Sequence, residues 1–218
     1  RITVRHVPYV TFPLANRRGT TILDRSSAYP LWGWRAGRLA AAWARAGAID
    51  IVHAFGASGL GYALAKRPGD PPLVLNPQGL EEFGATAERP PRLKRLAYLP
   101  LRAAVRVCAR RADAIIATDH ALEPVVIRHL APRPGQMVTI PNGLDLVETG
   151  ALAGPADGRM LRRRAGIRDG EFIVLSVGRL EHNKGFDLLA RALADARARS
   201  PRLDATGWRW VIAGAGPF

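Results

Sequence analysis

Cysteine is nearly absent from this sequence: Cys108 is alone among 218 residues, so no disulfide can form within the chain. A lone cysteine favours a reducing compartment, and we expect a cytoplasmic protein. Long apolar runs are also missing. The longest stretch without a formal charge, residues 51–65, falls short of the roughly 20 apolar residues that a membrane-spanning helix needs. We therefore expect a soluble protein, or one peripheral at the inner face of a membrane.

Lysine is scarce as well, although the formal net charge is +14. Such a charge suggests nucleic-acid binding. However, 29 of the 32 basic residues are arginines, in a chain that is also rich in alanine and glycine, and this bias can arise from the base composition of the coding DNA. The sequence contains no zinc-ligand set, RNA-binding aromatic motif or basic zipper. We expect no nucleic-acid partner.

Apolar segments of strand length alternate with helical segments along the chain, which predicts an α/β fold with mostly parallel sheets. The composition, 48% hydrophobic and 23% charged, is typical of a folded protein. We expect two Rossmann-like domains, residues 1–144 and 145–218, both incomplete in this chain. Strands are expected over residues 2–9, 49–54, 73–76, 112–118, 137–140, 172–177 and 208–213, and loops over 11–30 and 146–155.

The loop that follows the strand at 172–177 combines small and cationic residues. Gly178 can let the backbone turn or approach a ligand. Asn183 is a candidate N-cap for the next helix, whose N–H groups then carry a partial positive charge. Arg179 and Lys184 add two cations, and the combination predicts a phosphate or diphosphate site. The alternative is an ordinary exposed loop with basic residues.

Four sequence signals occur in a fixed order: His53 at the end of a strand, and the motifs VTIPNGLD, VGRLEHNKG and VIAGAGP. Together with ADAIIATDHAL, they resemble the retaining GT-B glycosyltransferases of the large nucleotide-sugar-dependent family four. That family includes bacterial sugar transferases that act on lipids and polysaccharides, and sucrose synthase. The resemblance implies two Rossmann-like domains that face a cleft, with the donor held mainly by the second domain.

The resemblance also implies roles for particular residues. Arg179 and Lys184 would grip the donor diphosphate and stabilise the charge that grows on it. The donor-binding glycines would be Gly178, Gly214, Gly216 and Gly56. The sequence has no Asp-x-Asp pair, which fits a reaction without a metal, and we expect no cofactor besides the nucleotide-sugar donor. A Glu-x7-Glu motif of the family is expected beyond Gly216, so we expect this chain to be a fragment that is inactive by itself.

Several of these residues have a second interpretation. His53 matches the family's histidine near the transferred sugar, or it is a buried histidine bonded to the backbone. Gly56, like the two glycines that follow at positions 59 and 61, either lets the donor approach or packs a helix on a strand. Glu81 and Glu82 lie on the expected acceptor side, but acidic residues are common at exposed helix starts.

Residues 91–111 interleave arginines with leucines and valines, and Pro100 is expected to divide them into two helical pieces. Arg102, Arg106 and Arg110 recur every four residues, which places them on one helix face. This segment either covers the sheet or contacts an anionic membrane, which suits a glycan or lipid-linked acceptor. The remaining alternatives are another nucleotide-binding α/β enzyme, such as a sugar-nucleotide epimerase or an NAD enzyme, and a basic surface-binding module.

Overall fold

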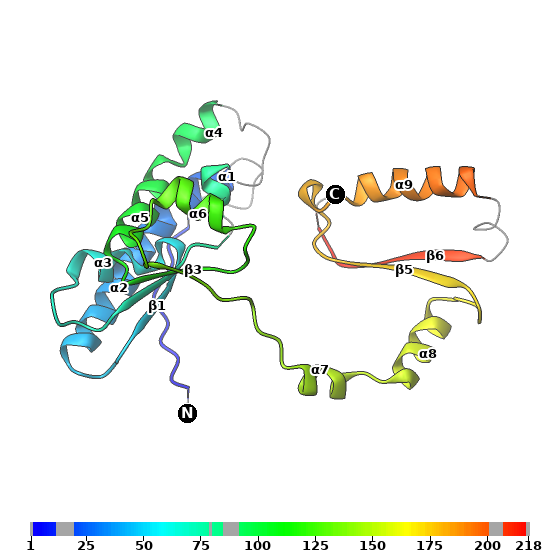
Figure 1. Ribbon diagram of the computed structural model, residues 1–218, viewed down its shortest axis with the longest axis horizontal. Coiled ribbons are helices and arrows are strands. Elements are labelled where there is room, and N and C mark those ends of the chain that lie inside the picture. The colour runs from blue at the N-terminus through cyan, green and yellow to red at the C-terminus, as the bar shows by residue number, and fades with distance from the viewer. Residues whose placement is uncertain (1, 12–19, 79, 85–91, 201–206, 217–218) are drawn as a thin grey trace. The chain divides into compact units, whose positions relative to one another are not determined.

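A computed structural model describes residues 2–11, 20–78, 80–84, 92–200 and 207–216. It divides into two compact units, Arg1–Asn142 and Gly143–Phe218 (Figure 1). We describe each unit by itself. No helix among the described residues is long and apolar enough to cross a membrane.

The first unit is built on a four-stranded parallel sheet, which confirms the predicted fold class. Its strands are β1 (Val52–Phe55), β2 (Leu73–Asn76), β3 (Ala114–Ala117) and β4 (Met137–Thr139), and they lie in the order β1-β2-β3-β4. Ala54 pairs with Leu75, and Leu75 pairs with Ile115, so the apolar side chains of neighbouring strands lie in one row. All carboxyl ends of the strands therefore meet at the same edge of the sheet.

The helices of this unit cover one face of the sheet (Figure 1). They are α2 (Tyr29–Arg45), α3 (Leu60–Ala65), α5 (Leu99–Arg111) and α6 (Glu123–Leu130). On the covered face, Leu73, Leu75 and Ile115 are fully buried against these helices. On the other face, His53 and Val138 are exposed. The core of the unit therefore lies between the sheet and a single layer of helices.

Glycines allow α2 to cross very close to the turn η2 (Gly56–Gly59) and to α3. A Cβ at Gly33 would lie 2.0 Å from the carbonyl oxygen of Ala57, and one at Gly61 would lie 1.9 Å from that of Trp34. Backbone atoms cannot move aside as a flexible side chain can. The structure thus supports the packing interpretation for Gly61, and the same holds for Gly59, whose Cβ would lie 2.7 Å from that of Ala54.

Three sequence predictions for this unit need revision. Residues 2–11 form no strand, because no described strand offers them a backbone partner; Trp32 Nε1 instead donates to the carbonyl oxygen of Val7. Part of the loop predicted at 11–30 is helical, as α1 (Thr20–Leu23) and a π-helical turn, η1 (Asp24–Ala28), lead directly into α2. The third revision concerns Asp119, which accepts from Leu122 N but caps a turn before α6, not the helix itself.

The basic segment is divided as predicted, into α4 (Arg92–Ala97) and α5, with Tyr98 between them. Pro100 stands in the first turn of α5, where its missing N–H would have no helical partner. Ser26 Oγ donates to the carbonyl oxygen of Ala97 and joins the end of α4 to η1.

The second unit contains one parallel pair of strands, β5 (Phe172–Val177) and β6 (Trp208–Ala213), with α9 (Phe186–Arg199) between them in the chain. Before this pair come α7 (Leu146–Leu152) and α8 (Pro155–Arg164). The loop predicted at 146–155 is therefore largely helical. Its missed signal is Asp145, which caps α7 by accepting from Glu148 N at 2.9 Å.

Candidate functional site

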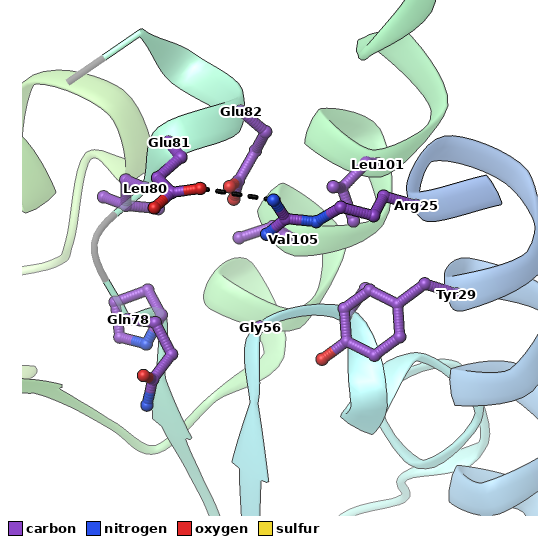
Figure 2. A pocket seen from close by; sticks show the side chains of 11 residues that line it. Arg25, Tyr29, Gly56, Gln78, Leu80, Glu81, Glu82, Leu101 and Val105 are labelled. Carbon is purple, nitrogen blue, oxygen red and sulfur yellow. Dashed lines mark hydrogen bonds and ion pairs between the residues drawn. The ribbon is translucent and has the colours of Figure 1, made fainter. Parts of the chain in front are cut away.

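A pocket of about 260 Å³ opens at the carboxyl ends of β1 and β2 (Figure 2). In open parallel sheets, ligands bind at this edge. Residues that follow the two strands form one side, and η1, α2 and α5 form the other. The lining consists of Arg25, Tyr29, Gly56, Ala57, Pro77, Gln78, Leu80, Glu81, Glu82, Leu101 and Val105.

The pocket combines one cation with two neighbouring carboxyl groups (Figure 2). Arg25 Nη1 lies 3.2 Å from Glu81 Oε2, and both side chains are about half exposed. Glu82 is only 8% exposed, and this burial raises the pKa of its carboxyl group. The backbone carbonyl of Glu82 accepts from Arg102 Nε at 2.5 Å, which fixes the segment against α5. The pocket can therefore offer both charged and neutral hydrogen-bonding groups to a polar ligand.

The backbone around the pocket is held in conformations that side chains disfavour. Gln78 has φ of 60° and Leu80 has φ of 52°, although neither is a glycine. Each such residue costs roughly 1–2 kcal/mol, and such strain concentrates at ligand sites. Gly56 has φ of 51° and carries no such cost. Tyr29 Oη donates to the carbonyl oxygen of Phe55 at 2.7 Å and holds the end of β1 beside it.

Three of the residues singled out from the sequence, Gly56, Glu81 and Glu82, come together in this pocket. His53 does not line it. Its exposed ring lies on the uncovered face of the sheet, with its centroid 4.8 Å from that of Phe55. The interpretation of His53 as a buried histidine is therefore wrong, because no helix packs over this face of β1.

The predicted anion loop in the second unit places Arg179 and Lys184 on opposite sides of the turn η4 (His182–Lys184). Arg179 Nη1 lies 2.7 Å from Glu181 Oε1, and both partners are accessible. Lys184 is exposed, and within the described part of the chain it makes no ion pair. Asn183 is not the N-cap: that position belongs to Gly185, whose φ of 69° starts α9.

The glycines that follow β6 lie directly against this loop. Gly178 N donates to the carbonyl oxygen of Ala213 at 3.1 Å, and Leu180 N donates to that of Ala215 at 3.0 Å. A Cβ at Gly214 would lie 1.9 Å from the carbonyl oxygen of Gly178. A Cβ at Gly216 would lie 2.2 Å from the carbonyl oxygen of Leu180. Close approach of the two loops thus accounts for both glycines.

Gly178 itself differs from these two glycines. A Cβ there would have only Phe186 Cζ nearby, at 3.7 Å, which is an ordinary contact. Its φ is not in the left-handed region among the described residues. The protein structure leaves room at this position for a side chain, and hence for the approach of a ligand.

A family comparison identifies the class of protein. The model of Glycosyltransferase Family 4 matches residues 5–148, about two thirds of the chain. The chain belongs to this family. Glycosyltransferase Family 4 membership implies a sugar donor and an acceptor in general terms. The match spans the sheet, the pocket and all its lining residues, whereas the loop with Arg179 and Lys184 follows the matched range. No curated protein matches the chain.

Sequence reasoning missed several pocket residues. Arg25 and Tyr29 fell in a segment predicted as a loop, and only their separation from β1 and β2 in sequence hid them. Gln78 stands two residues before Leu80 in the turn after β2, and a position directly behind a strand end was its available signal. Leu101 and Val105 carry the i, i+4 spacing of a buried helix face, but that spacing does not indicate which cavity the face lines.

Proposed function

We propose that this protein transfers a sugar from a nucleoside diphosphate sugar to an acceptor, with retention and without a bound metal or other cofactor. The match to Glycosyltransferase Family 4 over residues 5–148 is the observation that carries the proposal. A polar pocket at the carboxyl edge of a parallel sheet supports it, because that edge is where α/β folds bind ligands. The family match favours glycosyl transfer over an epimerase, an NAD enzyme or a basic binding module.

The donor diphosphate is assigned to the loop between β5 and α9. When the sugar leaves, negative charge grows on the distal phosphate, and cations aimed at it stabilise the transition state more than the ground state. Lys184 is exposed beside the start of α9, and Arg179 reaches the same loop from the end of β5. Arg179 has further N–H donors besides the one given to Glu181. Gly178, Gly214 and Gly216 complete the donor-binding set.

The acceptor is assigned to the pocket of the first unit. Glu81 and Glu82 offer carboxyl oxygens to acceptor hydroxyl groups, and Gly56 lets the ligand approach β1. His53 keeps its assigned place near the transferred sugar because its ring is accessible. The acceptor is a glycan, a lipid-linked molecule or a small hydroxylated compound. We place the protein in the cytoplasm, with a peripheral contact to anionic membrane through residues 91–111.

Titration calorimetry of the full-length protein with UDP and GDP tests the donor assignment. Each charge-assisted contact contributes roughly 1.5–3 kcal/mol, so Lys184→Ala should weaken nucleotide binding by about tenfold or more, and Arg179→Ala likewise. Arg191→Ala removes an equal charge from an exposed position farther along α9 and should leave the affinity unchanged. Unaltered affinity and turnover in both loop variants would contradict the assignment.

A further inference from the structure

Three leucines lie exposed on α4 and at the start of α5. Leu93, Leu96 and Leu99 are 79%, 62% and 51% exposed. Helical residues three apart are neighbours on one face, so Leu93 and Leu96 share a side of α4, and Leu99 follows at the next bend of the chain. In Figure 1, α4 projects from the helical layer of its unit. This exposed apolar surface contributes nothing to the core.

Arginines flank these leucines. An open groove of about 370 Å³ is lined by Arg95, Leu96, Leu99 and Arg102. Burial lowers the pKa of the Arg102 guanidinium, and the positive charges of Arg95 and Arg106 lower it further. Within the described residues, Arg95 and Arg102 have no ion-pair partner. The groove thus gathers positive charge beside apolar side chains without a carboxylate that pairs with it.

The row of three arginines predicted on α5 does not act as one surface. The guanidinium carbon of Arg102 lies 5.7 Å from the centroid of the Phe83 ring, and that of Arg106 lies 5.0 Å from it. Arg106 Nε also donates to the carbonyl oxygen of His129 at 3.3 Å. Both arginines are held in place by the protein. Arg110 is exposed at the far end of α5, about 12 Å along the helix axis from Arg102.

We propose that the α4 surface, defined as Leu93, Arg95, Leu96, Leu99 and Arg102, docks on a bilayer that contains anionic lipids. A bilayer surface offers what this combination needs in one plane: apolar chains for the leucines and phosphate groups for the arginines. Arg102 is fixed before docking, so less side-chain freedom is lost when a phosphate binds beside it. A protein partner with an acidic groove is the competing occupant.

Docking would also position the acceptor pocket. Arg102 donates to the backbone of Glu82, and the adjacent Leu101 lines the pocket. The membrane-facing groove and the pocket are therefore separated by the width of one helix, α5. An acceptor anchored in the bilayer would reach the pocket from this side. This last step rests on the proposed function, whereas docking itself does not.

Co-sedimentation of the full-length protein with vesicles tests the dock. Vesicles of phosphatidylcholine alone are compared with vesicles in which roughly a third is phosphatidylglycerol. We expect binding to the mixed vesicles, about fivefold weaker in Arg95→Gln because one surface cation is lost, and roughly tenfold weaker in Leu96→Gln. The matched controls, Arg110→Gln and Leu64→Gln, change an exposed arginine and an exposed leucine elsewhere and should bind as the parent does.

Binding that ignores the phosphatidylglycerol content, or that falls equally in the controls, would overturn the proposal. So would absence of vesicle binding, including the case in which inorganic phosphate binds at the groove or a protein partner is retained through it. Circular dichroism and thermal unfolding of each variant show whether a loss comes from misfolding. Sugar transfer to a soluble acceptor is measured in parallel. Its failure would contradict the proposed function, whereas intact transfer without vesicle binding would contradict only the dock.

Discussion

Two glycines of the donor loop, Gly178 and Gly214, should respond oppositely to the same substitution. In Gly214→Ala, the new Cβ would lie 1.9 Å from the carbonyl oxygen of Gly178. In Gly178→Ala, the nearest atom outside the adjoining chain is Phe186 Cζ at 3.7 Å. The first variant strains the protein itself. The second strains only a ligand that approaches Gly178 closely.

The size of each effect follows from these contacts. Overpacking against atoms that cannot move typically costs about 1–3 kcal/mol, and a backbone oxygen within 2 Å places Gly214→Ala at the upper end. For a domain of about 60–250 residues, each kcal/mol lowers Tm by roughly 2–8 °C. Gly178→Ala meets an ordinary contact and should leave Tm unchanged, or raise it slightly because alanine restricts the unfolded chain.

Thermal unfolding and donor titration of the full-length protein separate the two roles. We expect Gly214→Ala to lose stability, and Gly178→Ala to keep its stability but to need at least about tenfold more donor, which is about 1.4 kcal/mol of binding. If Gly178→Ala keeps both its stability and its donor affinity, the donor does not approach this position. If Gly214→Ala is as stable as the parent, the close packing of the two loops is wrong.

Two further predictions concern the first unit. Gly61→Ala would bring a Cβ to 1.9 Å from the carbonyl oxygen of Trp34 and should cost about 1–3 kcal/mol in urea unfolding, whereas Gly158→Ala, with no neighbour within 4 Å on α8, should gain about 0.5–1 kcal/mol from helix propensity. Burial raises the pKa of Glu82, so the folded protein holds this proton more tightly than the unfolded chain, and stability falls as pH rises through that pKa. Glu82→Gln should therefore be more stable than the parent at neutral pH and equal to it below the ordinary pKa of a glutamate; Glu81→Gln, which loses the ion pair with Arg25, should show no such gain in unfolding across pH.

The parallel sheets could be predicted because each strand carries its signal within a few residues. The segments 73–76, 172–177 and 208–213 have in the structure the bounds expected from their apolar runs. Segments whose structure depends on distant partners were predicted poorly. Residues 2–9 alternate like a strand, yet alternation gives no hydrogen bonds without a neighbouring strand. Residues 20–28 show no clear period, yet the packing of η1 against α4 and α5 makes them helical.

The pocket shows the same limit. Gly56, Glu81 and Glu82 could be selected from the sequence because each follows the end of a strand, and parallel strands bring these ends together. Arg25 could not, because it reaches the pocket from a helical turn whose position depends on the crossing of α2 over η2. That crossing needs glycines at particular points of contact. A sequence shows the glycines but not the atoms that they must avoid.

The arginine-rich composition is a related case, in which a total conceals separate local roles. The net charge of +14 suggests one basic surface, but the arginines of the structure have different partners. Arg25 pairs with a carboxylate inside the pocket. Arg168 donates to Glu171 beside β5, and Arg102 supports the backbone of Glu82. Of the arginines that contact the α4 groove, Arg95 is left without an acidic partner within the described residues, and its neighbours on α4 are exposed leucines. Charge is informative about a partner where the protein leaves it unpaired next to apolar surface, and that condition selects α4 out of a generally basic chain.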